Sequence, residues 1–130
     1  MDFSVLFVSP YQQDANSLRK MLDEASIPLV HATTLKDAAN KLGKRDYSVV
    51  LTEAHLGDGT WLDVLELTKR SGTELIVTDA WADARFWAAA INLGAYDLLA
   101  QPFHGAEVRR VLASASSRQT HVKATAAAVF

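Results

Sequence analysis

The chain has 130 residues, 49% of them hydrophobic, which is enough for one domain with a buried core and too few for two. Thirteen basic and fifteen acidic side chains give a formal charge of −2, so no overall field attracts nucleic acid or an anionic membrane. The chain contains no cysteine, which excludes disulfides and thiolate metal sites. It also has no basic leader and no apolar run of membrane-spanning length, and we expect a soluble, cytoplasmic protein.

Apolar runs of strand length alternate with stretches whose apolar residues recur every three or four positions, as on one face of a helix. Strands are predicted at 3–8, 29–32, 49–53, 75–78 and 96–100. Helices are predicted at 14–26, 34–43, 60–71, 83–93 and around 108–115. Parallel neighbours need crossovers of this kind, so the pattern predicts an α/β fold with a doubly wound five-stranded parallel sheet and helices on both faces.

Three side-chain types mark the ends of these helices. Asp14, either Thr33 or Thr34, and Asp83 are suitable N-caps, and Gly94 follows a helix at the position where glycine commonly ends one. After Ser114 the composition changes to Ser, Ala, Thr and Gln with scattered basic residues. We therefore expect one domain at 1–116 and a tail or linker at 117–130.

The strand at 49–53 has no polar face until it reaches Glu53, and it is followed by the turn Gly57-Asp58-Gly59. A strand of this type belongs in the middle of a sheet that is covered on both sides. Ligands of such sheets bind at the carboxyl ends of the strands. Glu53 is therefore the first candidate for a functional side chain.

Four segments carry a resemblance to a known family: 5–8, 46–51 with 56–59 behind it, 92–97, and 101–103. In this order and at these spacings, residues 3–116 resemble the response-regulator receiver domain of two-component signalling. The resemblance implies a flavodoxin-like (βα)5 fold with strand order 2-1-3-4-5. It also implies a site where strands one, three, four and five end.

The residues that would hold a metal and accept a phosphoryl group in this family are replaced here. Its acidic pair, which holds Mg²⁺, falls on Ser9 and Pro10, and its phosphoacceptor aspartate falls on Glu53. A hydroxyl and a proline supply almost no anionic oxygen for a hard cation. Without Mg²⁺, the charge of an incoming phosphoryl group is not neutralised. We expect no metal site and no cofactor.

The remaining positions implied by the resemblance are replaced as well. The hydroxyl residue after strand four matches Asp79, the lysine before the strand-five proline matches Gln101, and the aromatic switch residue matches Leu98. The resemblance therefore implies a degenerate receiver that is not an enzyme. We expect it to act through phosphorylation-independent protein–protein interaction with a histidine kinase, an output domain or another copy of itself.

Other interpretations stay open at this point. Glu53 is either an ordinary hydrogen-bonded carboxylate at a strand end or a permanent imitation of a phosphorylated aspartate. The altered pocket could serve a small-ligand sensor, or the chain could be a response regulator that is phosphorylated only conditionally. Trp81, Phe86 and Trp87 either fill the core or form an exposed anchor for a partner.

Two further expectations concern geometry at the strand ends. The resemblance implies a cis peptide bond between Gln101 and Pro102. Glu53 and Asp79 end adjacent strands, so we expect their carboxyl groups to interact and one of them to have a raised pKa.

Overall fold

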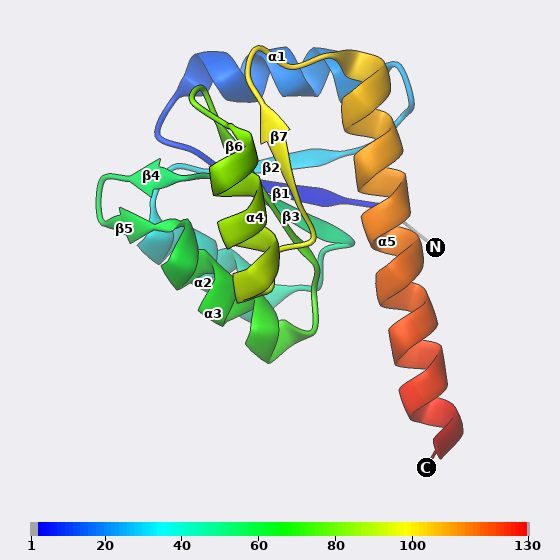
Figure 1. The fold of residues 1–130 in the computed structure, drawn as a ribbon. Coiled ribbons are helices and arrows are strands. Elements are labelled where there is room, and N and C mark those ends of the chain that lie inside the picture. The colour runs from blue at the N-terminus through cyan, green and yellow to red at the C-terminus, as the bar shows by residue number, and fades with distance from the viewer. Residues whose placement is uncertain (1–2, 130) are drawn as a thin grey trace.

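The computed structural model describes the backbone of residues 3–129 and the side chains of residues 3–117. A parallel sheet forms its centre, with the strand order β2-β1-β3-β6-β7 (Figure 1). The strands are β1 (Val5–Val8), β2 (Leu29–Ala32), β3 (Val49–Glu53), β6 (Leu75–Asp79) and β7 (Asp97–Ala100). A short antiparallel hairpin, β4 (His55–Leu56) and β5 (Gly59–Thr60), follows β3. With the hairpin set aside, this is the predicted order 2-1-3-4-5 of a flavodoxin-like (βα)5 fold.

Within residues 3–129, five helices cover the two faces of the sheet (Figure 1). They are α1 (Gln12–Asp23), α2 (Leu35–Lys44), α3 (Trp61–Ser71), α4 (Ala84–Leu93) and α5 (Gly105–Val129). Successive side chains of β1 point to opposite faces, so Val5 and Phe7 pack with α1 and α5 whereas Leu6 and Val8 pack with α2, α3 and α4. The domain therefore has two apolar layers, one on each side of the sheet.

The helix ends follow local side-chain chemistry. Thr34 caps α2 by accepting a hydrogen bond from the Asp37 N–H, and Asp83 caps α4 by accepting one from the Phe86 N–H. Gly94 ends α4 with φ of 119°, a conformation that favours glycine. These three predictions are confirmed. The prediction that Asp14 caps α1 is wrong, because the helix begins at Gln12 and places Asp14 in its first turn.

The β4–β5 hairpin is tied to the start of α2. The Asp58 carboxylate accepts hydrogen bonds from the Leu35 N–H at 2.7 Å and the Lys36 N–H at 3.1 Å. These two backbone donors hold the pKa of Asp58 below its ordinary value. The Gly-Asp-Gly turn thus supplies a second cap for α2 from a distant part of the chain.

Helix α5 continues to Val129, so it includes residues 117–129 of the stretch 117–130 that was expected to be a tail or linker, and residue 130 lies outside the described residues. Alanine is the strongest helix former, and Ala124, Ala126, Ala127 and Ala128 favour this continuation. Among the helices that the structure describes, none combines the length and the hydropathy needed to cross a bilayer.

Candidate functional site

Glu53 ends the central strand of the sheet, and its side chain is only 5% exposed. The Gln101 Nε2 donates to both carboxyl oxygens of Glu53, at 3.0 Å each. The Ser9 Oγ donates to Oε1 of the same group at 3.3 Å. Both oxygens of Glu53 therefore already accept hydrogen bonds from neighbours.

A second carboxyl group, that of Asp14, reaches Glu53 from the first turn of α1 and shares a hydrogen bond with it. Burial is the largest cause that raises the pKa of Glu53, and the hydrogen bond and charge of Asp14 add to it. Hydrogen bonds from Gln101 and Ser9 oppose the shift, and the pKa stands at about 8. At neutral pH Glu53 is therefore mostly protonated.

This arrangement corrects the expected pairing of Glu53 with Asp79. The strand extends one residue further than predicted, and the register places Thr78 opposite Glu53. The Gln101 Nε2 also donates to Oγ1 of the buried Thr78, at 3.3 Å, whereas the Asp79 carboxylate accepts from the Trp81 N–H in the following turn. The buried Thr78 hydroxyl therefore occupies the place beside Glu53 that was expected for Asp79.

The peptide bond between Gln101 and Pro102 is cis, as expected. The Gln101 side chain lies against Glu53 and Thr78 and joins the ends of β3, β6 and β7. Because it is an amide, it supplies hydrogen bonds but no positive charge.

A divalent cation of the type used by the resembled family does not fit these residues. Ser9 directs its hydroxyl to Glu53, and Pro10 is exposed and has no N–H. Glu53 is occupied by the donors described above. Within the described part of the chain, no three His, Cys, Asp or Glu side chains come together in a way that could hold a metal ion. Hard cations need several oxygen ligands, and a Glu53 side chain with a raised pKa and occupied oxygens does not supply them.

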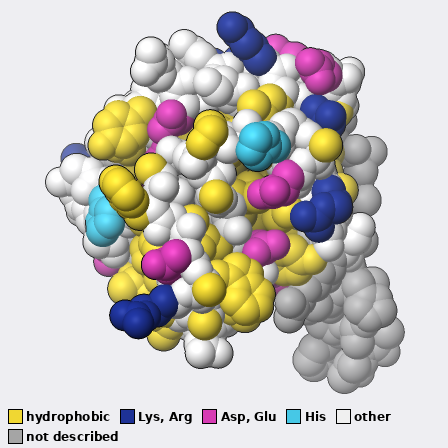
Figure 2. All heavy atoms as spheres, turned by 45° about the horizontal axis from the view of Figure 1, so that its top comes forward, with side chains coloured by type: hydrophobic (Ala, Val, Ile, Leu, Met, Phe, Trp, Pro, Cys, Tyr) yellow, Lys and Arg dark blue, Asp and Glu magenta, His cyan; other side chains and the backbone are white. Residues whose placement is uncertain are grey.

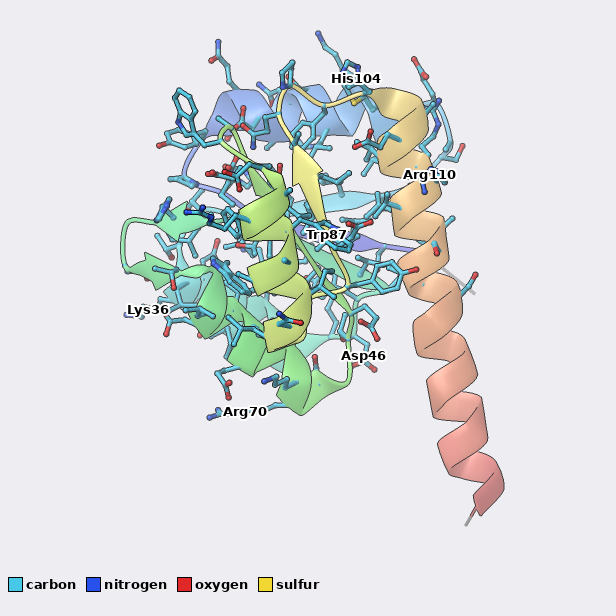
Figure 3. All side chains as sticks on the ribbon, in the orientation of Figure 1. Lys36, Asp46, Arg70, Trp87, His104 and Arg110 are labelled. Atoms are coloured by element: carbon cyan, nitrogen blue, oxygen red, sulfur yellow. The ribbon has the colours of Figure 1, made fainter. Side chains whose placement is uncertain are left out.

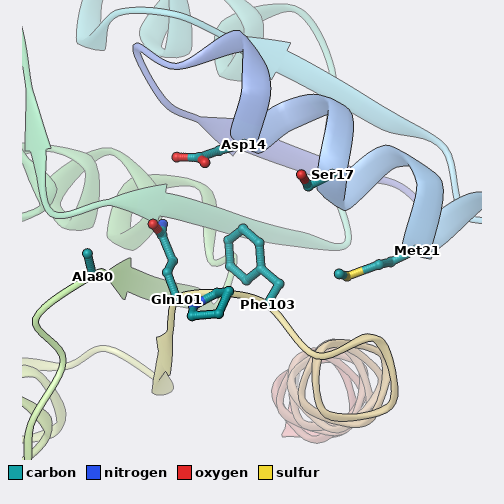
Figure 4. Close-up of a pocket in the computed structure, with 7 residues that line it drawn as sticks. Asp14, Ser17, Met21, Ala80, Gln101 and Phe103 are labelled. Carbon is teal, nitrogen blue, oxygen red and sulfur yellow. The ribbon is translucent and has the colours of Figure 1, made fainter.

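A cavity of about 380 Å³ adjoins this site, between α1 and the connection from β7 to α5. Its lining residues are Asp14, Ser17, Met21, Ala80, Gln101, Pro102 and Phe103 (Figure 4). Two of them, Asp14 and Gln101, contact Glu53 directly. The cavity therefore lies next to Glu53, which does not itself line it.

The three aromatic residues around α4 separate into two groups. Phe86 is half-buried and packs on Trp61, with ring centroids 6.1 Å apart, so it belongs to the core. Trp81 and Trp87 are 85% and 50% exposed. The Trp87 Nε1 donates to the Asp97 carboxylate at 3.1 Å, which holds the ring near the start of β7 (Figure 3). Leu98, which was expected to match the switch residue of the resembled family, is half-buried against the core.

No protein-family model matches the sequence, and neither does any curated protein sequence. Solved structures do match. The signal receiver domain of a putative LuxO repressor protein from Vibrio parahaemolyticus has a TM-score of 0.86 at 19% identity, over 96% of this chain and 98% of the other. A signal receiver domain of an HD domain-containing protein from Pseudomonas fluorescens Pf-5 has a TM-score of 0.83 at 23% identity, over 93% of this chain and 99% of the other.

A third match is a response regulator from Burkholderia pseudomallei that was solved with a phosphorylated aspartic acid, a calcium ion and citrate. Its TM-score is 0.77 at 19% identity, over 95% of this chain and 74% of the other. These likenesses show that the chain has the fold of response-regulator receiver domains.

Proposed function

We propose that this chain is an atypical receiver domain of a two-component system, which binds protein partners without being phosphorylated. The observation that carries the proposal is the state of Glu53. A carboxyl group attacks phosphorus only as the free carboxylate, whereas Glu53 has a pKa of about 8 and both of its oxygens accept hydrogen bonds. A module of this kind transmits information by binding rather than by catalysis.

The charges around Glu53 support the same conclusion. Phosphoryl transfer needs cations that neutralise the developing negative charge. Here Asp14 adds a negative charge, and Gln101 and Ser9 are neutral. An incoming phosphoryl dianion would meet repulsion where the reaction needs attraction.

The partner-binding surface that we propose centres on Trp81 and Trp87, on and beside α4. Exposed tryptophans are among the strongest anchors of protein interfaces. Asp97 fixes the Trp87 ring through a hydrogen bond, which lowers the entropy lost when a partner binds. The partner is a histidine kinase, an output domain or a second copy of this chain.

Of these three possible partners, a second copy of the chain can be tested with the chain alone. Sedimentation equilibrium of the wild type and of Trp87→Ser should show weaker association in the variant. Leu62→Ser is the matched control, because Leu62 is also an exposed apolar residue, 45% accessible, but lies on α3. Acetyl phosphate with Mg²⁺ should change neither result. Association that strengthens with acetyl phosphate would overturn the phosphorylation-independent mode and favour the conditionally phosphorylated regulator.

A further inference from the structure

The cavity beside Glu53 has two chemically different ends. Figure 4 shows Asp14, Ser17 and Met21 of α1 facing Gln101 and Phe103 across it. At one end lie the Asp14 carboxyl and the Gln101 amide, with Glu53 directly behind them. At the other end Met21, Pro102 and Phe103 form an apolar wall. A volume of about 380 Å³ lies within the range of small-molecule sites in proteins.

The apolar wall is held in place by the core. The Phe103 ring packs edge-on against the buried Phe7, with ring centroids 6.4 Å apart. Met21 is unbranched and adapts its shape to what it contacts. The cavity therefore offers a fixed aromatic surface opposite an adaptable one, and this combination fits a flat apolar group.

The polar end lacks a cation. Neither lysine nor arginine is among the residues that line the cavity. Arg109 reaches the Met21 carbonyl oxygen at 3.3 Å, but it pairs with Glu24. The ion pairs in the described part of the chain do not involve Asp14 or Glu53. Two carboxyl groups thus face each other without a positive partner.

The molecular surface around the cavity also combines acidic and hydrophobic side chains (Figure 2). Figure 2 shows the end of the molecule that carries α1 and the β7–α5 connection. Acidic side chains lie there among hydrophobic ones, and the basic side chains lie mostly nearer the outline of this face. An anionic ligand would meet repulsion at this end, and a cationic ligand would meet attraction.

We propose that this cavity binds a small organic cation, with an ammonium group at the Asp14 carboxylate and an apolar body against Met21, Pro102 and Phe103. An ammonium group donates up to three hydrogen bonds, and its bond to a carboxylate such as that of Asp14 is strengthened by the opposite charges. A hard divalent ion would lack further oxygen ligands and would leave the apolar wall unused. This site is separate from the proposed partner surface on α4, so either proposal can fail without the other.

The test uses benzylammonium as the probe and the whole chain, observed through backbone amide signals in two-dimensional NMR spectra. We expect saturable shifts for Asp14, Ser17, Gln101 and Phe103. Benzyl alcohol, the neutral analogue, and benzoate, the anionic one, should bind at least about tenfold more weakly, a difference of about 1.4 kcal/mol. Equal affinity for benzyl alcohol would overturn the proposal. It would also be overturned if Mg²⁺ shifted these amide signals to saturation while benzylammonium left them unmoved.

Two variants locate the charge that matters. Asp14→Asn keeps the shape of the side chain and removes its charge, and it should weaken benzylammonium binding by about tenfold or more. Glu66→Gln is the matched control, since Glu66 is an exposed carboxylate on α3 that does not line this cavity, and its affinity should equal that of the wild type. The spectrum of each variant also reports whether the fold is intact. Unchanged binding by a folded Asp14→Asn variant would overturn the proposal.

Discussion

The carboxyl group of Asp14, in the first turn of α1, shares a hydrogen bond with that of Glu53 at the end of β3. A hydrogen bond between two carboxyl groups requires a proton on one of them. Like charges in a partly desolvated site keep that proton at pH values where an isolated glutamate has lost it. The strand end that resembles a phosphorylation site is therefore a proton-holding site in this chain.

The stability of the protein should fall as the pH rises from about 5 to about 9. The pKa of Glu53 is about 8 in the folded chain, above the ordinary value of 4.5, so the folded state binds a proton that the unfolded state has lost. That contribution is fully present below the ordinary pKa and disappears as the pH passes through about 8. Urea unfolding at a series of pH values measures it.

Glu53→Gln removes this titration and should flatten the pH profile. Asp14→Asn should move the loss of stability to lower pH values, because it takes away one cause of the raised pKa. Asp79→Asn is the control. The Asp79 carboxylate accepts a hydrogen bond from the Trp81 N–H and does not contact Asp14 or Glu53. The stability of Asp79→Asn should therefore depend on pH as that of the wild type does. A Glu53→Gln profile as steep as that of the wild type would contradict the assignment.

Incubation with acetyl phosphate and Mg²⁺ should leave the mass of the wild-type chain unchanged. Glu53 is protonated near neutral pH, and Ser9 and Gln101 supply neither a metal ligand nor a cation. Intact-protein mass spectrometry checks this result. A phosphoryl adduct that disappears in Glu53→Gln would show that the carboxyl group reacts after all.

Gly59→Ala should destabilise the domain by about 1–3 kcal/mol. A methyl group at this position would lie 2.6 Å from the Asp63 Oδ2 and 2.8 Å from the Leu35 Cδ2. Asp63 lies in the first turn of α3, and Leu35 is the first residue of α2. Gly57→Ala is the matched control in the same turn, since no atom lies within 4 Å of its added carbon. Chemical denaturation of the two variants should separate them, and equal losses would show that the hairpin moves aside.

Trp61→Ala should cost about 3–5 kcal/mol of unfolding free energy, and Trp81→Ala should change it by about 0.5 kcal/mol or less. Trp61 is 8% exposed and packs on Phe86, whereas Trp81 is 85% exposed. Thermal or urea unfolding followed by circular dichroism compares them. A large loss for Trp81→Ala would mean that its ring has a structural role within this chain.

The fold could be predicted from the sequence because it rests on periodic apolar patterns and on local caps such as Thr34, Asp83 and Gly94. The cis bond before Pro102 was predicted from the resemblance. These features depend on neighbouring residues or on a motif. They are therefore visible in a single chain.

The composition of the site could be predicted only in part. Ser9, Glu53 and Gln101 do come together, but Asp14 and Thr78 were missed. Each error came from an element boundary displaced by one or two residues, which changes the side chain that faces the site. Asp14 was interpreted as a cap because aspartate is a common one, and no pattern in the sequence marks the start of α1 at Gln12 instead.

The double capping of α2 has a consequence for the order in which the chain acquires structure. Thr34 can cap this helix as soon as its own first turn has formed, whereas Asp58 reaches Leu35 and Lys36 only after β3 and the hairpin have been synthesised. On the ribosome, α2 therefore has its local cap first and gains the second when the central strand docks. The Gly-Asp-Gly turn thus adds its cap to α2 only after the middle of the sheet has formed.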